Sequence, residues 1–398
     1  MLQAATLKRI LVLAALSLAV SCPIDHLAAA DPVLSDMAMD VGLANVGPSQ
    51  GDMPVFAYRG SLAIVPSRHG NPWPVMVRDE SGRFGPVATV LPHKEDGHGC
   101  TAADLTDPAL AGPDGLVDLI CTKGACHGTC TREYRKELWV QRPEGGFVNL
   151  AGAAGIAQPH ARGRDTTALA LPDGRVVVAF ANERSSGYPA ESIDRAYLVA
   201  GGVFTELPLQ DASGTRRSNS AGFCVVAVPR PDALPDLLFC DGSKVNAYRH
   251  DSDGYKLTDA YGSFYALDLL VADVDGDARP DILAITRTRL AVRLGGTAPM
   301  ALARLQDAHG LAYGDMDCDG QADILVVQSA GAGNAHLLLL NNGGGLSYRA
   351  VPFPHPTTGS GDAATYVPDW DGAGHAAMLV SHGHYTSGPT SFVTSSCN

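Results

Sequence analysis

Four aspartates alternate with other residues in one short loop that lies between two apolar runs of the chain. The segment 269–285 reads LLVADVDGDARPDILAI, and its aspartates fall at positions 1, 3, 5 and 9 of the loop. The segment 311–327, LAYGDMDCDGQADILVV, is a second copy with the same spacing. Two copies of strand, acidic loop and strand indicate a repeat protein. The two sets are Asp273, Asp275, Asp277 and Asp281, and Asp315, Asp317, Asp319 and Asp323.

Carboxylates this close together repel one another unless a cation offsets their charge. Alternate positions in a tight turn direct successive oxygens inward, and a backbone carbonyl at position 7, from Arg279 or Gln321, adds another oxygen. Calcium takes about six to eight oxygens and tolerates a flexible cage of protein ligands, so it is favoured over magnesium. Gly276 and Gly320 supply the backbone angles for such a loop. The alternative is an Asp- and Gly-rich hairpin turn without metal.

The D-x-D-G-D-x-x-x-D loop at 273–281, between two hydrophobic strands, resembles the FG-GAP (VCBS-type) repeat. That repeat occurs in the propellers of integrin α-subunits and in many secreted bacterial proteins. The resemblance implies a β-propeller of four-stranded blades, with calcium in the loop between the first two strands of some blades. It implies no single function, because carriers of the motif differ in function.

Other parts of the chain hold incomplete versions of this loop. In the segment before 121, Asp104 takes position 1, and Asp114 and Asp118 keep the spacing of positions 5 and 9. An insertion with Thr106 and Asp107 lies between them, and ion binding there stays open. We therefore expect two or three structural Ca²⁺ ions, each neutralising a loop that could not otherwise fold.

Two further segments keep only part of the pattern. One retains Asp369 and Asp371, and the other retains Asp232 and Asp236. Both are expected to be turns without metal.

Strand, loop and strand patterns recur seven times, which predicts the blades of one propeller. The segment at 33–44, VLSDMAMDVGLA, can supply the strand that the last blade lacks and close the ring, which removes an exposed sheet edge. We predict an all-β fold, a seven-bladed β-propeller with four-stranded antiparallel blades, as a single domain over residues 31–398. The blades are expected at about 53–91, 98–151, 164–209, 219–260, 264–305, 308–353 and 360–398.

The N-terminal segment has the features of a signal peptide. A short basic region precedes an apolar run at 10–20, which is too short to span a bilayer. The alanines at 28–30 suit cleavage by signal peptidase, whereas LAVSC at 18–22 resembles a bacterial lipobox with Cys22 as the lipidated residue. We expect residues 1–30 to be removed, and the protein to be secreted, periplasmic or held at the cell surface by one lipid anchor.

The composition narrows the class of partner. A formal net charge of −13 and a pI near 5.4 argue against a nucleic-acid partner. With 44 Gly and 26 Pro, turns are frequent and long helices are improbable. Besides Cys22, an even number of cysteines remains, as expected for a chain in an oxidising compartment.

Two pairs of cysteines each bracket a strand-loop-strand unit, so paired strands would bring each pair within bridging distance. The segment CHGTC at 126–130 is expected to close a small loop, since its alternative, a zinc site with His127, lacks a second ligand pair. That leaves the last two cysteines for each other. The predicted disulfides are Cys100–Cys121, Cys224–Cys240, Cys126–Cys130 and Cys318–Cys397.

Two long connectors, 123–136 and 182–195, join the second and third strands of neighbouring blades. The resemblance implies that they share one rim, on the face opposite the calcium loops. Arginine and aromatic residues on loops held by a rigid scaffold suit ligand contact, although the loops can also be tolerated insertions. The HGHY segment at 382–385 is interpreted as a Gly-rich turn. The candidate ligand-binding residues are Arg132, Tyr134, Arg135, Arg184, Tyr188 and Glu191.

The sequence contains no His-Glu-x-x-His, Gly-x-Ser-x-Gly or Walker-type motif. We therefore expect a non-enzymatic binding or adhesion module for an extracellular protein or glycan. One alternative is a polysaccharide lyase or glycoside hydrolase on the same ring, and another is a structural component of the envelope or matrix. A Tyr/Trp cluster with two carboxylates outside the loops, at one axial mouth, would favour the enzyme. An apolar and aromatic rim without such carboxylates would favour binding.

Overall fold

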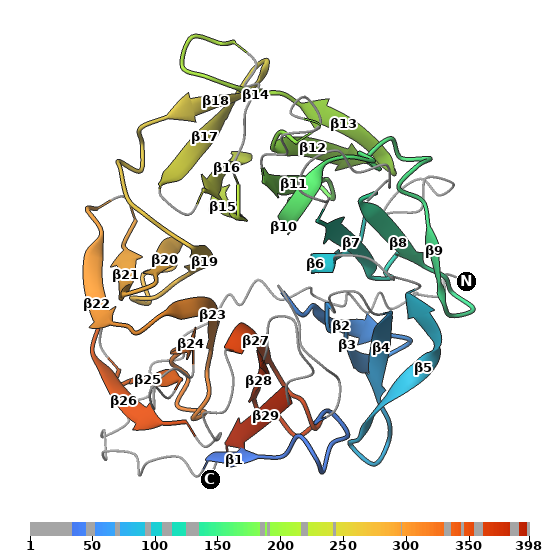
Figure 1. The fold of residues 1–398 in the computed structure, drawn as a ribbon, viewed down its shortest axis with the longest axis vertical. Helices are drawn as coiled ribbons and strands as arrows, with labels where there is room; N and C mark the ends of the chain where they lie inside the picture. The colour runs from blue at the N-terminus through green and yellow to red at the C-terminus, as the bar shows by residue number, and fades with distance from the viewer. Residues whose placement is uncertain are drawn as a thin grey trace, which may run out of the picture.

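The strands of the computed structural model form seven sheets around one axis (Figure 1). No α-helix occurs in the part of the chain that the structure describes. Residues 1–33, with the expected signal peptide and Cys22, lie outside that part. The described residues are 34–44, 52–67, 72–91, 97–105, 114–124, 135–183, 188, 192–215, 222–241, 244–295, 297–329, 336–343, 346–353, 361–382 and 390–395.

The sheets are the seven blades that the sequence predicts. In blades 1 to 6 the four antiparallel strands follow one another in sequence. Blade 1 contains β2 (Val55–Tyr58), β3 (Ser61–Ile64), β4 (Trp73–Arg78) and β5 (Phe84–Leu91). Blade 2 contains β6 (Gly97–Ala103), β7 (Asp118–Lys123), β8 (Glu137–Gln141) and β9 (Phe147–Asn149). Blade 3 contains β10 (Arg162–Ala170), β11 (Val176–Glu183), β12 (Arg195–Ala200) and β13 (Val203–Leu207).

Blade 4 contains β15 (Cys224–Arg230), β16 (Ala233–Cys240), β17 (Val245–Asp251) and β18 (Gly254–Thr258). Blade 5 contains β19 (Asp268–Ala272), β20 (Asp281–Thr286), β21 (Arg289–Arg293) and β22 (Met300–Arg304). Blade 6 contains β23 (Ala308–Gly314), β24 (Asp323–Gln328), β25 (Leu337–Asn341) and β26 (Tyr348–Pro352).

Blade 7 is assembled from both ends of the described chain. Its first three strands are β27 (Gly361–Val367), β28 (Ala377–His382) and β29 (Thr390–Ser395), and β1 (Leu34–Asp36) pairs with β29 as the fourth (Figure 1). The prediction that the N-terminal segment closes the ring is therefore confirmed.

Blade 4 has a fifth strand that the sequence does not reveal. The two-residue strand β14 (Leu209–Gln210) runs parallel to β18, with Leu209 opposite Tyr255. The N–H of Tyr255 donates to the carbonyl of Pro208 at 2.9 Å. The connection from blade 3 thus continues along the outer edge of blade 4 before it enters that blade.

The core lies between neighbouring blades. The second strands β7, β24 and β28 are buried along their whole length, whereas the outer strand β22 is mostly open to solvent. One core cluster joins Val177 and Ala179 of blade 3 to Leu237 and Phe239 of blade 4. A strand buried on both faces is apolar at successive positions, which explains runs such as ILVV in β24.

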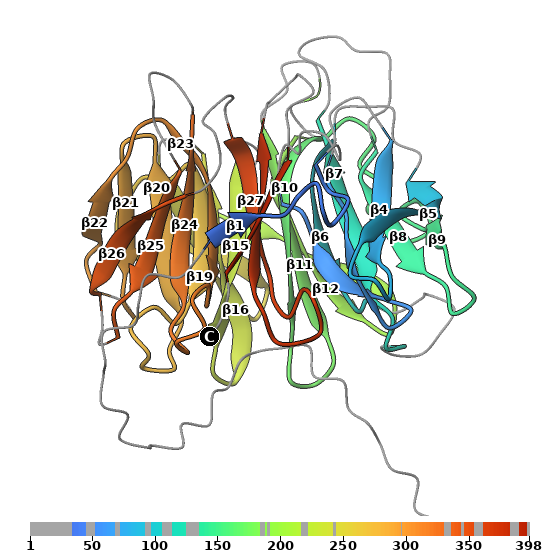
Figure 2. The same cartoon turned by 90° about the horizontal axis from the view of Figure 1, so that it is seen from below.

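The antiparallel order of strands gives the ring two different faces. Turns between first and second strands emerge on one face, here called the loop face, which carries 273–281 and 315–323. Connectors between second and third strands emerge on the opposite face, here called the connector face. Figure 2 shows two turns of the loop face, those after β15 and β27, at the bottom of the ring.

Two disulfides join first to second strands. Cys100–Cys121 links β6 to β7 and Cys224–Cys240 links β15 to β16, with Cα–Cα distances of 4.1 and 5.1 Å. Both are among the predicted pairs. They indicate an oxidising compartment, extracellular or periplasmic. Within the described residues, no helix has the length and apolarity to cross a bilayer.

Candidate functional site

The two complete acidic loops gather the same three aspartates, those at positions 1, 3 and 9. In each loop, one carboxylate oxygen from each of the three lies within 4.8 Å of the other two. Gly276 and Gly320 have φ angles of 78° and 83°, in the region that favours glycine, as the sequence predicts. The two groups are Asp273, Asp275 and Asp281 in blade 5, and Asp315, Asp317 and Asp323 in blade 6.

The aspartate at position 9 is the first residue of the second strand and is buried in both loops. Asp281 accepts N–H bonds from Val274 and Gly295, both at 2.9 Å. Asp323 accepts the two equivalent bonds at 2.7 and 2.8 Å. Burial raises the pKa of Asp281 and raises that of Asp323 to about 7. Main-chain donors therefore orient these carboxylates, but they do not supply the positive charge that the ionised forms need.

Asp315 shows most directly that a cation fits. Its Oδ2 atom accepts the N–H of Gly320 at 3.0 Å, whereas its Oδ1 atom is buried and has no hydrogen-bond partner. Burial and the nearby charge of Asp319 raise the pKa of Asp317 to about 6. A buried oxygen without a donor costs about 1–3 kcal/mol. Carboxylate oxygens are the donors that calcium prefers, so these residues fit the predicted ion.

Positions 5 and 7 are arranged differently from positions 1, 3 and 9. Asp277 accepts hydrogen bonds from the main-chain N–H and the guanidinium of Arg279, which lower its pKa. Asp319 accepts the N–H of Gln321 at 2.7 Å. Neither Asp277 nor Asp319 belongs to the groups of three. Ligation by these carboxylates and by the carbonyls of Arg279 and Gln321 stays a prediction.

Blade 2 shares one part of the arrangement. Asp118 accepts two main-chain N–H bonds at 3.1 and 3.0 Å, as Asp281 does, and burial raises its pKa to about 7. Asp104 accepts the N–H of Asp114 at 3.3 Å. Among the described residues, these three aspartates do not form a group as close as those of blades 5 and 6. The third ion therefore stays a prediction.

Blades 4 and 7 place a basic side chain beside one of their aspartates. The buried Asp236 pairs with Arg249 at 2.7 Å and accepts the hydroxyl of Tyr261 at 3.0 Å. In blade 7, Asp371 pairs with His375. In these two blades, a carboxylate on the loop face thus pairs with a basic side chain.

Two cavities lie along the axis of the ring and share Asp52, Leu311 and Ala364. The larger has a volume of about 410 Å³ and the smaller about 120 Å³. First strands of several blades line both cavities, so they occupy the centre of the propeller. The larger cavity is lined by Met53, Pro54, Thr101, Leu270, Tyr313 and Tyr366, and the smaller by Arg164, Asp165, Phe223, Asp268 and His309, among others.

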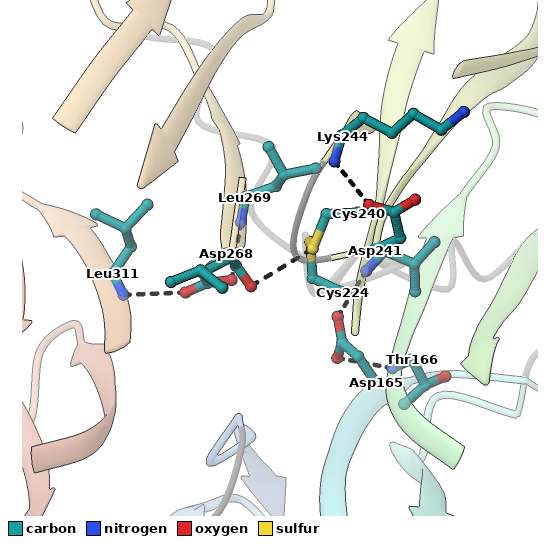
Figure 3. The surroundings of a disulfide bond; sticks show 11 residues. Asp165, Thr166, Cys224, Cys240, Asp241, Lys244, Asp268, Leu269 and Leu311 are labelled. Carbon is teal, nitrogen blue, oxygen red and sulfur yellow. Dashed lines mark hydrogen bonds between the residues drawn. A yellow bond between two sulfur atoms is a disulfide. The ribbon is translucent and has the colours of Figure 1, made fainter. Parts of the chain in front are cut away.

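Two carboxylates at the smaller cavity tie one blade to the next (Figure 3). Asp165 of β10 accepts the N–H groups of Thr166 and of Val225 in blade 4, at 2.7 and 2.8 Å. Asp268 of β19 makes the equivalent pair of bonds, and the second of them comes from Leu311 in blade 6 at 3.1 Å. Burial raises the pKa of Asp165 and raises that of Asp268 to about 7. All four oxygens are therefore occupied by main-chain donors.

Asp52 differs from these two carboxylates. Its side chain is open to the lumen of both cavities and makes no hydrogen bond or ion pair with the described residues. Protein nevertheless surrounds the lumen, and this burial raises the pKa of Asp52 to about 6. Sequence reasoning misses Asp52, Asp165 and Asp268 because each is a single aspartate without a spacing pattern.

On the connector face, the described ends of the two long connectors contact each other. Lys136, at the end of the first, is fully buried and donates to Asn182, at the start of the second, at 2.6 Å. Burial lowers the pKa of Lys136 to about 7. Of the six candidate ligand-binding residues, Arg135 and Tyr188 are described, and the ring of Tyr188 stacks on His160 with centroids 4.0 Å apart.

Several predicted features fall outside the described residues and stay predictions. They are the insertion residues Thr106 and Asp107, the disulfide Cys126–Cys130, Cys397 as the partner of Cys318, the candidate ligand-binding residues Arg132, Tyr134, Arg184 and Glu191, and the His384 and Tyr385 part of the 382–385 turn.

Comparisons with known proteins give little beyond this geometry. No protein-family model matches the chain, and no curated protein matches it. Among solved structures, a match is the crystal structure of AofleA from Arthrobotrys oligospora, with 12% identity and a TM-score of 0.45. The match covers 81% of this chain and 90% of that chain. The FG-GAP resemblance thus rests on the loop motif, and the propeller rests on the strand topology.

Proposed function

We propose that this protein is an extracellular binding module that takes a glycan residue in its larger axial cavity. The observation that carries the proposal is the lining of that cavity. Tyr313 and Tyr366 line it together with Thr101, Thr365 and Asp52, whose carboxylate makes no hydrogen bond with the described residues. Aromatic rings accept the C–H faces of a sugar, while hydroxyl and carboxylate groups bind its hydroxyls. A volume of about 410 Å³ lies within the range of small-ligand pockets.

Calcium ions in the two complete loops support this role. Asp273, Asp275 and Asp281 would hold one ion, and the equivalent aspartates of blade 6 would hold the other. The ion supplies positive charge and closes the loop, and it takes no part in any reaction. The role of the ions is structural. They would fix the loops on one face of the ring and so help to maintain the shape of its cavity.

The test is a calorimetric titration of the full chain with each member of a panel of oligosaccharides. Asp52→Asn should weaken binding about tenfold, the equivalent of about 1.4 kcal/mol, because a neutral amide oxygen replaces a charged acceptor. Asp211→Asn is the matched control, since Asp211 lies in an exposed turn and bonds only within it. Equal affinity in Asp52→Asn would place the ligand elsewhere on the ring. Binding of a protein but of no glycan would replace the glycan with a protein ligand.

An enzyme on the same ring is the second candidate, and one observation favours it. Asp52, Asp165 and Asp268 surround one lumen, and burial raises the pKa of each, as acid catalysis on a glycan requires. Against it, Asp165 and Asp268 already accept main-chain donors at every oxygen. The tyrosines line the larger cavity, whereas these two carboxylates line the smaller one.

An assay for products separates the two functions. Glycans that bind are incubated with the protein and examined for new reducing ends or unsaturated sugars. Intact glycans support the binding module. Cleavage that is lost in Asp165→Asn or Asp268→Asn would support the hydrolase or lyase instead.

A further inference from the structure

A tyrosine of the following blade holds each complete acidic loop. Tyr313 of β23, in blade 6, donates its hydroxyl to the carbonyl of Asp273 in the blade 5 loop at 2.5 Å. Tyr366 of β27, in blade 7, donates to the carbonyl of Asp315 in the blade 6 loop at 3.3 Å. Burial raises the pKa of both hydroxyls, to about 12 for Tyr366, so both stay protonated donors.

These tyrosines occur only where a complete loop precedes them. The first strands of blades 2, 3, 4 and 5 contain no tyrosine, and none of them follows a blade with a complete loop. Blade 1 has Tyr58 in its first strand, but that hydroxyl accepts the N–H of Gly146 in blade 2. The pairing of loop and tyrosine therefore depends on the loop and is not a general feature of the blades.

The backbone beside Tyr313 is built to admit the second tyrosine. Gly314 follows Tyr313 in β23, and a Cβ atom at Gly314 would overlap the ring of Tyr366. Asp315, position 1 of the blade 6 loop, comes directly after Gly314. The hydroxyl of Tyr313 thus contacts the blade 5 loop, and the strand that contains Tyr313 continues directly into the blade 6 loop.

We propose that Tyr313 couples the two metal loops, so that an ion in the blade 5 loop strengthens binding of an ion in the blade 6 loop. The coupling rests on the metal binding proposed above. Tyr313 binds Asp273 at the carbonyl of position 1, so a closed blade 5 loop fixes the strand that presents Asp315. An ion in the blade 5 loop then lowers the conformational entropy cost of ordering the blade 6 loop. This difference in free energy couples the two sites. Tyr366 holds the blade 6 loop to blade 7, whose loop lacks the full set of aspartates, and transmits no such coupling.

Metal binding is measured with Ca²⁺ by calorimetry and with Tb³⁺ by luminescence, because nearby tyrosines transfer energy to bound terbium. Asp275→Asn disables the blade 5 loop, and the affinity of the blade 6 loop is then compared with that of the wild type. We expect a loss of about fivefold or more, the lower end of common coupling between sites. In Tyr313→Phe the same Asp275→Asn change should leave the affinity of the blade 6 loop unaltered.

Tyr366→Phe is the matched control, since it removes the equivalent hydroxyl from the other loop. It should weaken the blade 6 loop itself while the effect of Asp275→Asn persists. Equal effects of Asp275→Asn in the Tyr313→Phe protein and in the wild type would overturn the coupling through Tyr313. Two ions bound independently by the wild type would overturn the coupling but leave the metal sites intact. Failure of the wild type to bind any ion would overturn the metal sites as well. If Tyr313→Phe does not fold, the wild-type comparison with Asp275→Asn still decides whether the loops are coupled.

Discussion

Asp323 and Asp236 are both buried aspartates on the second strand of a blade, and each faces the end of the first strand. Asp236 pairs with Arg249, whereas Asp323 has main-chain donors and a pKa raised to about 7 by burial. A buried carboxylate without a cation is expensive to ionise. The difference between the two explains why the turn of blade 4 needs no added cation, whereas the loop of blade 6 could hold a metal ion.

The raised pKa values predict how stability depends on pH. Asp118, Asp268 and Asp323 have folded pKa values of about 7, above the value of about 3.9 in an unfolded chain. The folded state therefore binds more protons than the unfolded state between about pH 4 and 7, and its stability falls as pH rises through that window. We expect the chelated protein to melt at a higher temperature at pH 5 than at pH 8.

Calcium should act in the opposite direction, because it favours the ionised carboxylates. The rise in melting temperature on adding calcium should therefore be larger at pH 8 than at pH 5. Magnesium serves as the control and should give a smaller rise. A melting temperature that increases from pH 5 to pH 8 in chelator would contradict this prediction. It would show that neighbouring groups stabilise the ionised form of these carboxylates.

Gly314→Ala tests the contact between blades 6 and 7. The added methyl group would overlap the ring of Tyr366, and overpacking of this kind costs about 1–3 kcal/mol. Urea unfolding should show that loss. Gly85→Ala is the control in another strand, since nothing lies within 4 Å of a Cβ placed there. A neutral Gly314→Ala would mean that the ring moves aside at little cost.

The acidic loops could be predicted from sequence, but the axial carboxylates could not. Asp273, Asp275 and Asp281 lie in one loop at a fixed spacing, so their chemistry is visible in the chain itself. Asp165 and Asp268 are more than a hundred residues apart along the chain. Only the closed ring places them beside one lumen.

At the scale of elements, the second strands are the most predictable part of the fold. They are buried on both faces, and segments such as AMLVSH of β28 are apolar over several successive positions. The strand β14 could not be predicted, because two residues carry no periodicity. Its pairing depends on where Pro208 leaves blade 3, which is a property of the assembled ring.

Removal of the Cys224–Cys240 disulfide should destabilise blade 4 through its unfolded state. The two cysteines are 16 residues apart, and a loop of about that length is associated with about 3 kcal/mol of stabilisation. Cys224→Ser with Cys240→Ser should lose that amount in urea unfolding. Reductant should lower the stability of the wild type by more than that of the double variant. An unchanged midpoint in the double variant would show that strand pairing alone holds β15 and β16.

At the scale of the whole molecule, the number of blades and the closure of the ring follow from counting. The last blade has one strand too few, and the N-terminal segment can supply it. The cavities could not be predicted, because their volumes depend on how first strands from several blades pack around one axis. The sequence therefore predicts the ring and its loops, but not the lumen.

Ser35→Pro tests the seam of the ring. Ser35 pairs with Thr394 in the register of β1 and β29, and proline removes a main-chain donor that a strand pair needs. We expect a lower melting temperature and a tendency to associate, because β29 would become an exposed edge. Ser35→Thr is the control and should behave as the wild type in melting and in size-exclusion chromatography. A monomeric Ser35→Pro protein of full stability would mean that β1 contributes nothing to closure.

The seam also sets an order in time. The N–H of Phe392 donates to Asp36, 356 positions earlier in the chain. During synthesis, β1 emerges among the first strands and must wait for its partner until nearly every other strand has been made. Contacts so distant in sequence form slowly, because the entropy cost of closing a long loop must be met before the contacts stabilise the fold. Earlier blades can pack against one another as they appear, but the ring stays open until β29 is available to pair with β1.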